Sequence, residues 1–207
     1  MSPKSIRYFL KALLTISFFF LSLAGVSAAA EGVVFDQNSG SVEFHATGRP
    51  SAIKIVGKGK SSKGDFSVKD MVVTGSAHFD LASLDTGIET RNTHMKEKYL
   101  EVPKFPEAVL TLTKMELPKD FSKESSFTKV PFTGSLSLHG VDHPVSGAAD
   151  ISRHEDGVTI NATFGLKIAD FAIALPTFMG ITMADDVQIT VQSKASVVKP
   201  DAAPKTK

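Results

Sequence analysis

The sequence contains no cysteine, and this absence limits both its chemistry and its means of stabilisation. It excludes disulfides, thiolate metal sites, a cysteine nucleophile and a lipid anchor on an N-terminal cysteine. The serine-hydrolase pattern GxSxG and the metalloprotease pattern HExxH are also absent, although His154-Glu155 begins like the second pattern. We therefore expect a protein that is not an enzyme, needs no cofactor and depends on its core for stability.

The sequence also lacks a convincing metal-binding pattern, despite its six histidines. His139 and His143 are four residues apart, but they flank a turn instead of sharing one helix face. No carboxylate-rich set of ligands surrounds them, as a zinc or calcium site would require. We predict no metal site.

Neither sign of charge dominates the chain, which has 23 basic and 22 acidic residues. This balance gives no global electrostatic reason to bind nucleic acid, and we predict no such partner. A local group of lysines, which we interpret as a solvated loop face, lies in the string GKGKSSKG. That string ends like a phosphate-binding loop, but Lys54 stands where the motif needs its first glycine.

Long apolar runs are absent after the first 30 residues. Within those residues, Lys4, Arg7 and Lys11 precede an apolar run of about 15 residues, and Ser27 and three alanines then supply small side chains. This order predicts a secretory signal peptide over residues 1–30 and a periplasmic or secreted protein. The run is short for a membrane span of ~20 residues, so we predict no stable membrane insertion.

From Val33 onward, apolar and polar residues alternate in a way that is typical of β-strands with one buried face. Eight such segments indicate an all-β fold of one domain over residues 31–198, followed by a disordered tail over residues 199–207. An up-and-down antiparallel barrel is favoured because closure removes exposed edges, and a two-sheet sandwich is the alternative. The expected strands centre on residues 42–46, 53–57, 71–81, 108–115, 132–138, 145–151, 158–166 and 187–191.

One segment between the expected strands has a helical pattern instead, near residues 91–101. Asn92 or Thr93 can cap a helix, Met95 and Tyr99 share a helix face, and Pro103 forbids its continuation. A short helix in this position could cover the mouth of a pocket that holds an amphiphile. On residue types alone, the favoured interpretation is a helix that plugs one end of the barrel, because most apolar residues on amphipathic helices belong to the core.

The size of the expected inward residues leaves the barrel interior open to two interpretations. Small residues at Gly75, Ala77 and Ala162 would leave room for a prenyl or acyl chain, which is bound by burial of its methylene groups. The alternative is a filled barrel that acts as a protein-interaction module or a structural stress protein. The large residues that would fill it are Phe79, Phe132, Phe164 and Phe171.

Several short motifs occur along the chain in a fixed order. They are Leu81–Gly87 (LASLDTG), Arg91–Met95 (RNTHM), Tyr99-Leu100, Phe105-Pro106, Thr133–Val141 (TGSLSLHGV), Pro144-Val145 and Asp170-Phe171. Together these motifs resemble the YceI-like family, the lipocalin-like polyisoprenoid-binding domain of bacterial secreted proteins. The resemblance covers residues 33–195 and rests on the order and spacing of the motifs. It implies an eight-stranded antiparallel barrel with a helix and an elongated pocket for an amphiphilic lipid.

The sequence departs from the usual family pattern at two places. Asn92 follows Arg91 where the family usually has aspartate, and Ala172 follows Asp170-Phe171 where the family usually has glycine, without the usual nearby arginine. Arg91 has two open interpretations, as a contact to the ligand head group or as a clamp to the loop at Asp85.

These observations predict a carrier or sequestering protein for an amphiphilic isoprenoid, such as a quinone or polyprenyl compound, or for a fatty-acyl ligand. No turnover of the ligand is expected, and a homodimer is left open. The candidate ligand-binding residues are Phe79, Leu81, Arg91, His94, Met95, Tyr99, Phe105, Leu110, Phe132, Leu136, Phe164, Phe171, Phe178 and Met179.

Overall fold

The structure is a computed structural model that describes residues 31–35, 40–49, 53–121, 124–155, 157–178 and 180–198. Within these ranges, the side chains of residues 31–35, 61–63, 178 and 196–198 are not described. The expected signal peptide over residues 1–30 and the expected tail over residues 199–207 both lie outside the described residues.

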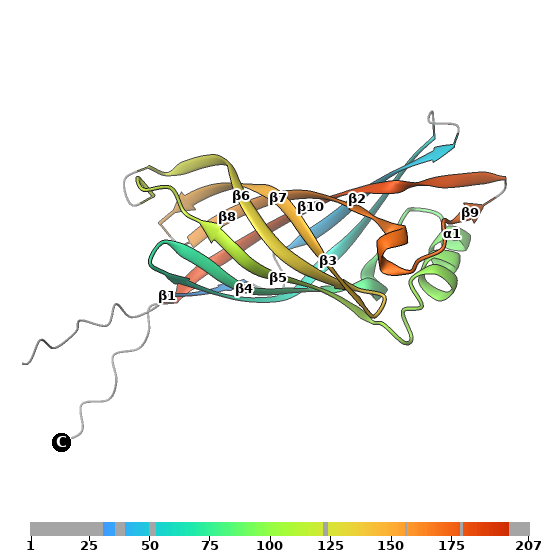
Figure 1. The fold of residues 1–207 in the computed structure, drawn as a ribbon, viewed down its shortest axis with the longest axis horizontal. Coiled ribbons are helices and arrows are strands. Elements are labelled where there is room, and N and C mark those ends of the chain that lie inside the picture. The colour runs from blue at the N-terminus through green and yellow to red at the C-terminus, as the bar shows by residue number, and fades with distance from the viewer. Residues whose placement is uncertain are drawn as a thin grey trace, which may run out of the picture.

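The described residues form one antiparallel sheet of ten strands with four short helical segments (Figure 1). The strands are β1 (Glu31–Phe35), β2 (Ser41–Arg49), β3 (Lys54–Lys69), β4 (Val72–Asp80), β5 (Glu107–Glu116), β6 (Ser126–Leu138), β7 (Val141–His154), β8 (Gly157–Lys167), β9 (Thr177–Phe178) and β10 (Ile181–Val198). The helical segments are η1 (Leu81–Ser83), α1 (Glu89–Thr93), η2 (His94–Tyr99) and η3 (Ile168–Phe171).

The sheet closes on itself because β10 pairs with both β8 and β2. β1 pairs with the same two neighbours as β2, which are β10 and β3, so the two strands share one position around the ring. β9 contributes only a two-residue pairing with the start of β10. The ring therefore has eight positions, which confirms the predicted barrel, and the ten strands arise from one divided position and one short hairpin.

Strict alternation makes the strands one-sided, as β6 shows. Phe132, Leu136 and Leu138 are buried and separated by exposed or half-buried residues. A two-residue turn at His139 and Gly140, both with positive φ, then leads directly into β7. The turn is shorter than the sequence indicated, because β7 already begins at Val141.

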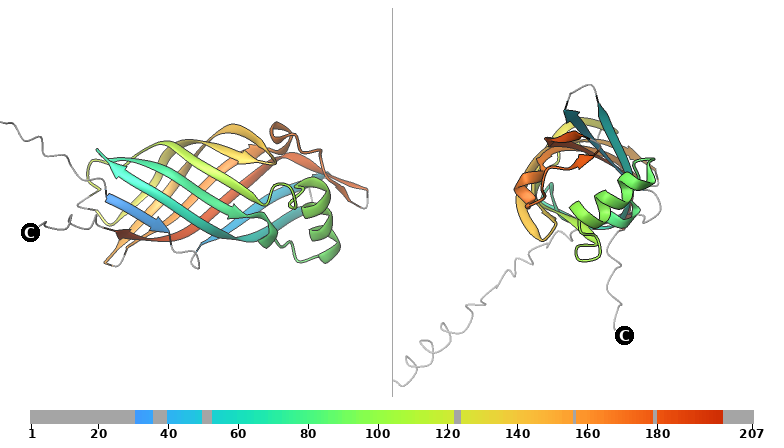
Figure 2. Two further views of the ribbon diagram at one scale, coloured as in Figure 1. Left: turned by 90° about the horizontal axis from the view of Figure 1, so that it is seen from below. Right: turned by 90° about the vertical axis from the view of Figure 1, so that its right-hand side faces the viewer.

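The inserted helix lies across one end of the barrel (Figures 1 and 2). It begins at Glu89 and ends at Tyr99, two residues earlier at both ends than predicted, and its second part is a π-helix. Ile88 precedes it without a side-chain cap, so neither Asn92 nor Thr93 serves as the cap that the sequence suggested. Asn92 instead bonds to the loop that precedes the helix.

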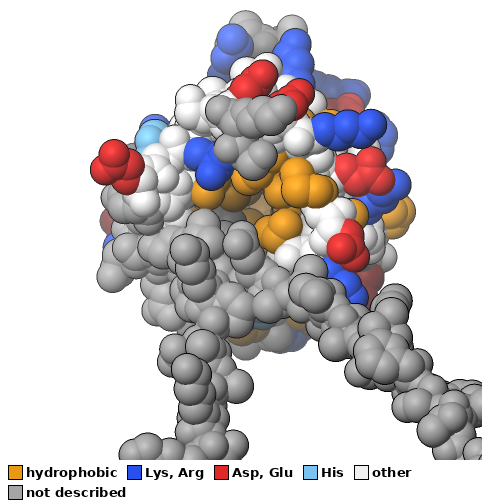
Figure 3. Space-filling model, turned by 90° about the vertical axis from the view of Figure 1, so that its left-hand side faces the viewer, with side chains coloured by type: hydrophobic (Ala, Val, Ile, Leu, Met, Phe, Trp, Pro, Cys, Tyr) orange, Lys and Arg blue, Asp and Glu red, His pale blue; other side chains and the backbone are white. Residues whose placement is uncertain are grey.

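The half of the barrel away from the helix is packed with its own side chains. Met115, Val130, Ala149 and Ile151 are all buried in one hydrophobic cluster there. At the outer face of this end, hydrophobic side chains lie among charged ones in the described part of the surface (Figure 3). This half matches the filled interior that was one of the two expectations.

Gly75 does not create free space in the barrel as the sequence suggested. Its φ is +142°, and a Cβ added there would lie 2.2 Å from the backbone oxygen of Asp65. The register of β4 and β5 also shifts between Val73 and Gly75. Glycine is therefore required by the backbone at this irregularity, where two strands approach closely.

Candidate functional site

An apolar cavity occupies the half of the barrel beneath α1 and η2. Its volume is about 230 Å³. The lining residues are Val42, Phe44, Ile53, Ile55, Gly59, Lys60, Phe79, Asp80, Leu81, Leu84, Thr86, Arg91, His94, Met95, Tyr99, Leu100, Ala108, Leu136, Leu138, Phe164, Leu166, Ile168, Ile173, Pro176, Ile181, Met183, Val187 and Ile189.

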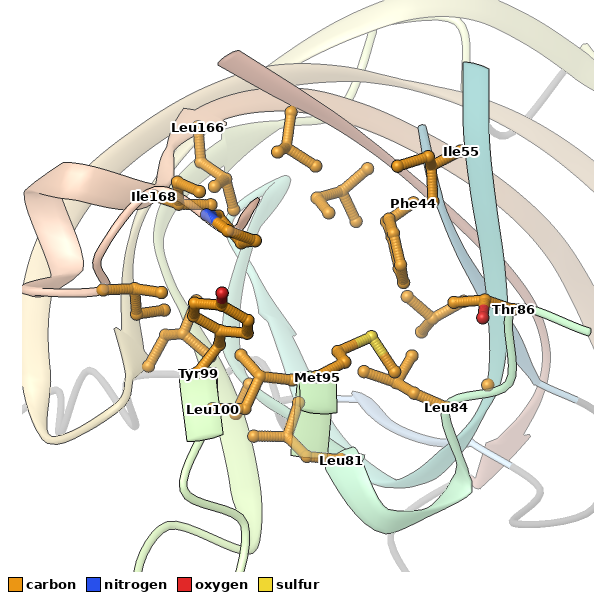
Figure 4. A pocket seen from close by; sticks show the side chains of 18 of the residues that line it. Phe44, Ile55, Leu81, Leu84, Thr86, Met95, Tyr99, Leu100, Leu166 and Ile168 are labelled. Atoms are coloured by element: carbon orange, nitrogen blue, oxygen red, sulfur yellow. The ribbon is translucent and has the colours of Figure 1, made fainter. Parts of the chain in front are cut away.

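The walls come from opposite sides of the barrel, and the helix covers one side of the mouth (Figure 4). Phe44 and Ile55 face Leu166 and Ile168 across the open centre. Met95 projects from the helix into the same space. Because apolar groups make up most of the surface, the cavity suits an apolar body better than a charged one.

The Phe44 ring forms part of the cavity wall and packs over the backbone of Gly57. The two residues are paired on β2 and β3, and a Cβ at Gly57 would lie 2.2 Å from Cε1 of the Phe44 ring. Only glycine leaves room for the ring in this position. The cavity wall at Phe44 therefore depends on a residue of the neighbouring strand.

Polar groups gather at the rim, where Arg91 holds the loop before the helix. The Arg91 Nε donates to Thr86 Oγ1 at 2.8 Å, and Nη2 donates to the Thr86 backbone oxygen at 2.7 Å. Asn92 Oδ1 accepts hydrogen bonds from the Thr86 backbone N–H and from Thr86 Oγ1. The contacts of Arg91 are those expected of a structural clamp, although its side chain also lines the cavity.

Asp85 completes this rim network. Its Oδ1 accepts hydrogen bonds from the Gly87 N–H and from Asn92 Nδ2, both at 2.7 Å. These two bonds, first that from Gly87 and then that from Asn92, lower the pKa of the Asp85 carboxyl group. The amide of Asn92 can donate to this carboxylate, whereas the aspartate that the family usually has could not do so in its ionised form.

Tyr99 joins the helix to the opposite side of the mouth. Its hydroxyl accepts a hydrogen bond from the Thr177 N–H at 3.1 Å and lies 3.3 Å from the Thr177 backbone oxygen, to which it donates. Thr177 begins β9, in the segment between η3 and β10. A single side chain thus connects two segments that are far apart in the sequence and that both border the cavity.

A second cluster holds the outside of the same end together. His139 is 14% exposed at its side chain and lies 3.1 Å from both the Phe171 oxygen and Glu101 Oε2. The Phe105 ring meets His139 edge-on, and Phe171 is fully buried. A hydrogen bond from Lys104, and then one from His139, lowers the pKa of Glu101. This cluster fixes η3 against the β6–β7 turn and does not line the cavity.

Eight of the fourteen predicted residues line the cavity, and they come from β4, the helical segments, β6 and β8. Leu110 and Phe132 are buried but do not line it, and Phe105 and Phe171 belong to the outer cluster. The Phe178 side chain and the whole of Met179 lie outside the described residues. The eight that line the cavity are Phe79, Leu81, Arg91, His94, Met95, Tyr99, Leu136 and Phe164.

The prediction missed the contribution of β2, β3 and β10. Phe44, Ile55 and Ile189 line the cavity, and all three belong to alternating stretches that the sequence shows clearly. The alternation identified them as inward-facing, but it did not indicate which end of the barrel is hollow. Conversely, the small residues Ala77 and Ala162 pack against the core and do not line the cavity.

Two kinds of feature were not found among the described residues. Among the residues that the structure describes, no group of three or more His, Cys, Asp or Glu side chains is arranged to hold a metal ion. In the same residues, no helix combines the length and the apolar character needed to cross a membrane.

The chain belongs to the YceI-like family. The model of the YceI-like domain matches residues 34–195, which include β2 to β9, most of β10 and the helix over the mouth. No curated protein matches the chain in sequence.

Solved structures with the same fold include two bacterial proteins. One is a polyisoprenoid-binding domain from Saccharophagus degradans implicated in plant cell wall breakdown, with a TM-score of 0.61 and 14% identity, covering 80% of this chain and 98% of that one. The other is BcnA from Burkholderia cenocepacia, with a TM-score of 0.63 and 18% identity, covering 78% of this chain and 99% of that one. At these identities the likeness shows the fold alone.

Proposed function

We propose that the protein binds an amphiphilic lipid in this cavity and carries or sequesters it without turning it over. The ligand would be an isoprenoid, such as a quinone or polyprenyl compound, or a fatty-acyl compound. The observation that carries the proposal is the cavity of about 230 Å³ whose surface is almost entirely apolar.

The arrangement of the rim fits an amphiphile with its head group outward. Arg91 and His94, on the helix that lies over the mouth, line the cavity, and most of the other lining residues are aliphatic or aromatic. A head group could meet these rim residues as the tail enters the barrel. Each methylene group that leaves water contributes about 0.8 kcal/mol to binding.

The membership of the YceI-like family supports the same proposal, and the Saccharophagus degradans domain of the same fold is a polyisoprenoid-binding domain. The signal peptide indicated by residues 1–30 supports a location in the periplasm or outside the cell. A carrier of this kind would shield an apolar lipid during its passage through water.

The competing proposal, a structural or protein-interaction barrel, predicted an interior filled by large side chains. The packed half of the barrel fits that picture, but the half beneath the helix is hollow. The cavity favours the carrier.

The direct experiment is native mass spectrometry of the purified protein, followed by uptake of a fluorescent acyl or prenyl probe. We expect a bound amphiphile or saturable uptake in the micromolar range or tighter. A protein that emerges empty and takes up no probe would refute the proposal.

A matched pair of variants tests whether the cavity is where the probe binds. Ala108 lines the cavity, so Ala108→Leu should fill part of it and reduce probe affinity by about tenfold or more. Ala148, on the opposite face of β7 from the buried Ala149, is the control, and Ala148→Leu should leave uptake unchanged. Equal affinities in both variants would place the probe elsewhere.

A further inference from the structure

The cavity does not continue into the far half of the barrel, and its end can be followed strand by strand. On β5, Ala108 lines the cavity, whereas Leu110, the next inward residue, is buried and does not. On β4, Phe79 lines it, whereas Ala77 packs against the core. On β6, Leu136 lines it, whereas Phe132 is 3% exposed and lies outside the lining.

Phe132 is placed to close the cavity at the end that faces the packed half of the barrel. It pairs with Gly147 on β7, which in turn pairs with Phe164 on β8. A Cβ at Gly147 would lie 2.7 Å from Cζ of Phe132 and 2.8 Å from Cβ of Phe164. The Phe132 ring therefore lies across β7, over the place where any other residue would have a side chain.

The two rings meet at that point. Their centroids are 6.2 Å apart, and the planes are inclined at 81°, which is an edge-to-face contact. Phe164 contacts the cavity, since it is one of the lining residues. Phe132 supports it from the packed half, where Met115 is its neighbour on β5.

We infer that Phe132, held over Gly147 against Phe164, is the floor of the cavity and limits the length of tail that the protein accepts. The inference rests on the proposed function and refines its ligand class. The ligand is an amphiphile whose apolar tail ends in the half of the barrel beneath the helix, instead of a chain that runs the full length of the barrel.

Such a floor gives the affinity a characteristic dependence on chain length. Each methylene that enters the cavity should tighten binding about fourfold, the equivalent of its transfer from water. Once the tail reaches the floor, further methylenes must stay outside or force the chain to fold back. The gain per carbon then stops, and the plot of affinity against length has a break.

The test is a series of saturated fatty acids and of prenyl alcohols of increasing length, which compete with a fluorescent acyl probe for the protein. Phe132→Ala should move the break to longer chains. Ligands just beyond the parent's break should gain about fourfold for each methylene that the deeper cavity accepts. Ligands shorter than the break should change by less than about threefold.

Phe127→Ala is the matched control, because Phe127 is also a buried phenylalanine of β6. It stacks on Phe121 with ring centroids 5.1 Å apart and does not line the cavity. Its loss should lower the melting temperature without moving the break. Phe132→Leu, a milder change, serves where Phe132→Ala does not fold.

The possible outcomes distinguish failure of the proposed role of Phe132 from failure of the proposed lipid binding. A folded Phe132 variant with the break of the parent overturns the floor and leaves lipid binding intact. A parent whose affinity rises without a break up to the longest chain also overturns it, and that measurement needs no variant. A parent that binds no chain of any length refutes the proposed function and the floor together.

Discussion

At the scale of single residues, glycines determine where aromatic rings lie in this barrel. Gly57 accepts the ring of Phe44 in the cavity wall, and Gly147 accepts the ring of Phe132 below the cavity. Both glycines have inward positions in which a side chain would occupy the space of the ring. The shape of the cavity is thus set partly by residues that have no side chain themselves.

Gly57→Ala tests this role in the wall. The new Cβ would lie 2.2 Å from the Phe44 ring, so the ring must move toward the cavity. We expect uptake of a bulky prenyl probe to fall by about threefold to tenfold, with a loss of stability of about 1 to 3 kcal/mol from overpacking. Isothermal titration and thermal unfolding of the same preparation measure both effects.

Gly165→Ala is the control for that change. A Cβ at Gly165 has no neighbour within 4 Å, and the residue lies in a strand without a positive φ. It should leave both stability and uptake close to those of the parent. Equal behaviour of the two alanine variants would contradict the role given to Gly57.

Asn92→Asp tests the rim network and has a defined dependence on pH. The new carboxylate would face Asp85 Oδ1 at the 2.7 Å now spanned by a hydrogen bond, so it should raise the pKa of Asp85, which is lowered in the parent. The variant should be less stable than the parent at pH 7, and the difference should shrink as acid protonates one of the two groups.

In the parent, by contrast, the hydrogen bonds to Asp85 should stabilise the folded state at pH 7 and lose this effect in acid. Because the folded-state pKa of Asp85 is lowered, its contribution is fully present above the unfolded pKa and is lost as the pH falls through the folded value. Thermal unfolding of both proteins between pH 3 and pH 8, a window of roughly five units around ordinary carboxyl values, measures the effect. A stability difference that does not vary with pH would contradict this account.

At the scale of secondary-structure elements, the sequence predicted the barrel well because alternation records which side of each strand is buried. β6 is the clearest case, since buried residues alternate with more exposed ones from Val130 to Leu138. The start of the helix was predicted less well. The preference of Asn92 for a cap position was overridden by its bonds to Thr86 and Asp85, which lie six and seven residues earlier in the loop before the helix.

The same limit explains which site residues were found. Arg91, His94, Met95 and Tyr99 were identified because a helix inserted among strands stands out in the sequence. Ile189 was not chosen, since alternation says only that it faces inward. Whether an inward residue meets a cavity or another side chain depends on its partners on two neighbouring strands, which local sequence does not specify.

The two segments that border the mouth, η2 and the stretch that contains β9, are connected by Tyr99. Tyr99→Phe removes both hydrogen bonds to Thr177 and keeps the ring. At roughly 1 kcal/mol for the pair, we expect the mouth to open about fivefold more often and the probe to dissociate faster by a similar factor. Stopped-flow displacement of the probe measures the rate.

Thr113→Val provides the comparison for this variant. It removes a hydroxyl that bonds to the Thr133 oxygen at 3.1 Å, on β5 and away from the cavity lining. Dissociation of the probe should stay at the rate of the parent. If Tyr99→Phe also leaves the rate unchanged, the connection does not control access to the cavity.

At the scale of the whole molecule, the barrel divides into a packed half and a hollow half that share the same strands. β10 illustrates this, since Val187 and Ile189 line the cavity whereas Ala195 is buried in the packed half. The packed half can provide stability that does not depend on ligand, because Met115, Val130, Ala149 and Ile151 are buried there by other side chains of the protein. The hollow half lacks such contacts until a ligand supplies them.

This division predicts where a ligand stabilises the protein. Saturation at 100 times the dissociation constant should add about 2.7 kcal/mol to the free energy of unfolding. Local openings of the hollow half should be suppressed before those of the packed half, because only the hollow half contacts the ligand.

In hydrogen exchange, added protection should therefore concentrate in η2, in the paired stretches of β2 and β3 that contain Phe44 and Ile55, and in the first half of β10. The amides of Val130 and Ile151, in the packed half, should change only as far as global unfolding slows. Protection spread evenly over both halves would contradict a ligand confined by the floor, and protection restricted to the packed half would place the ligand outside the cavity.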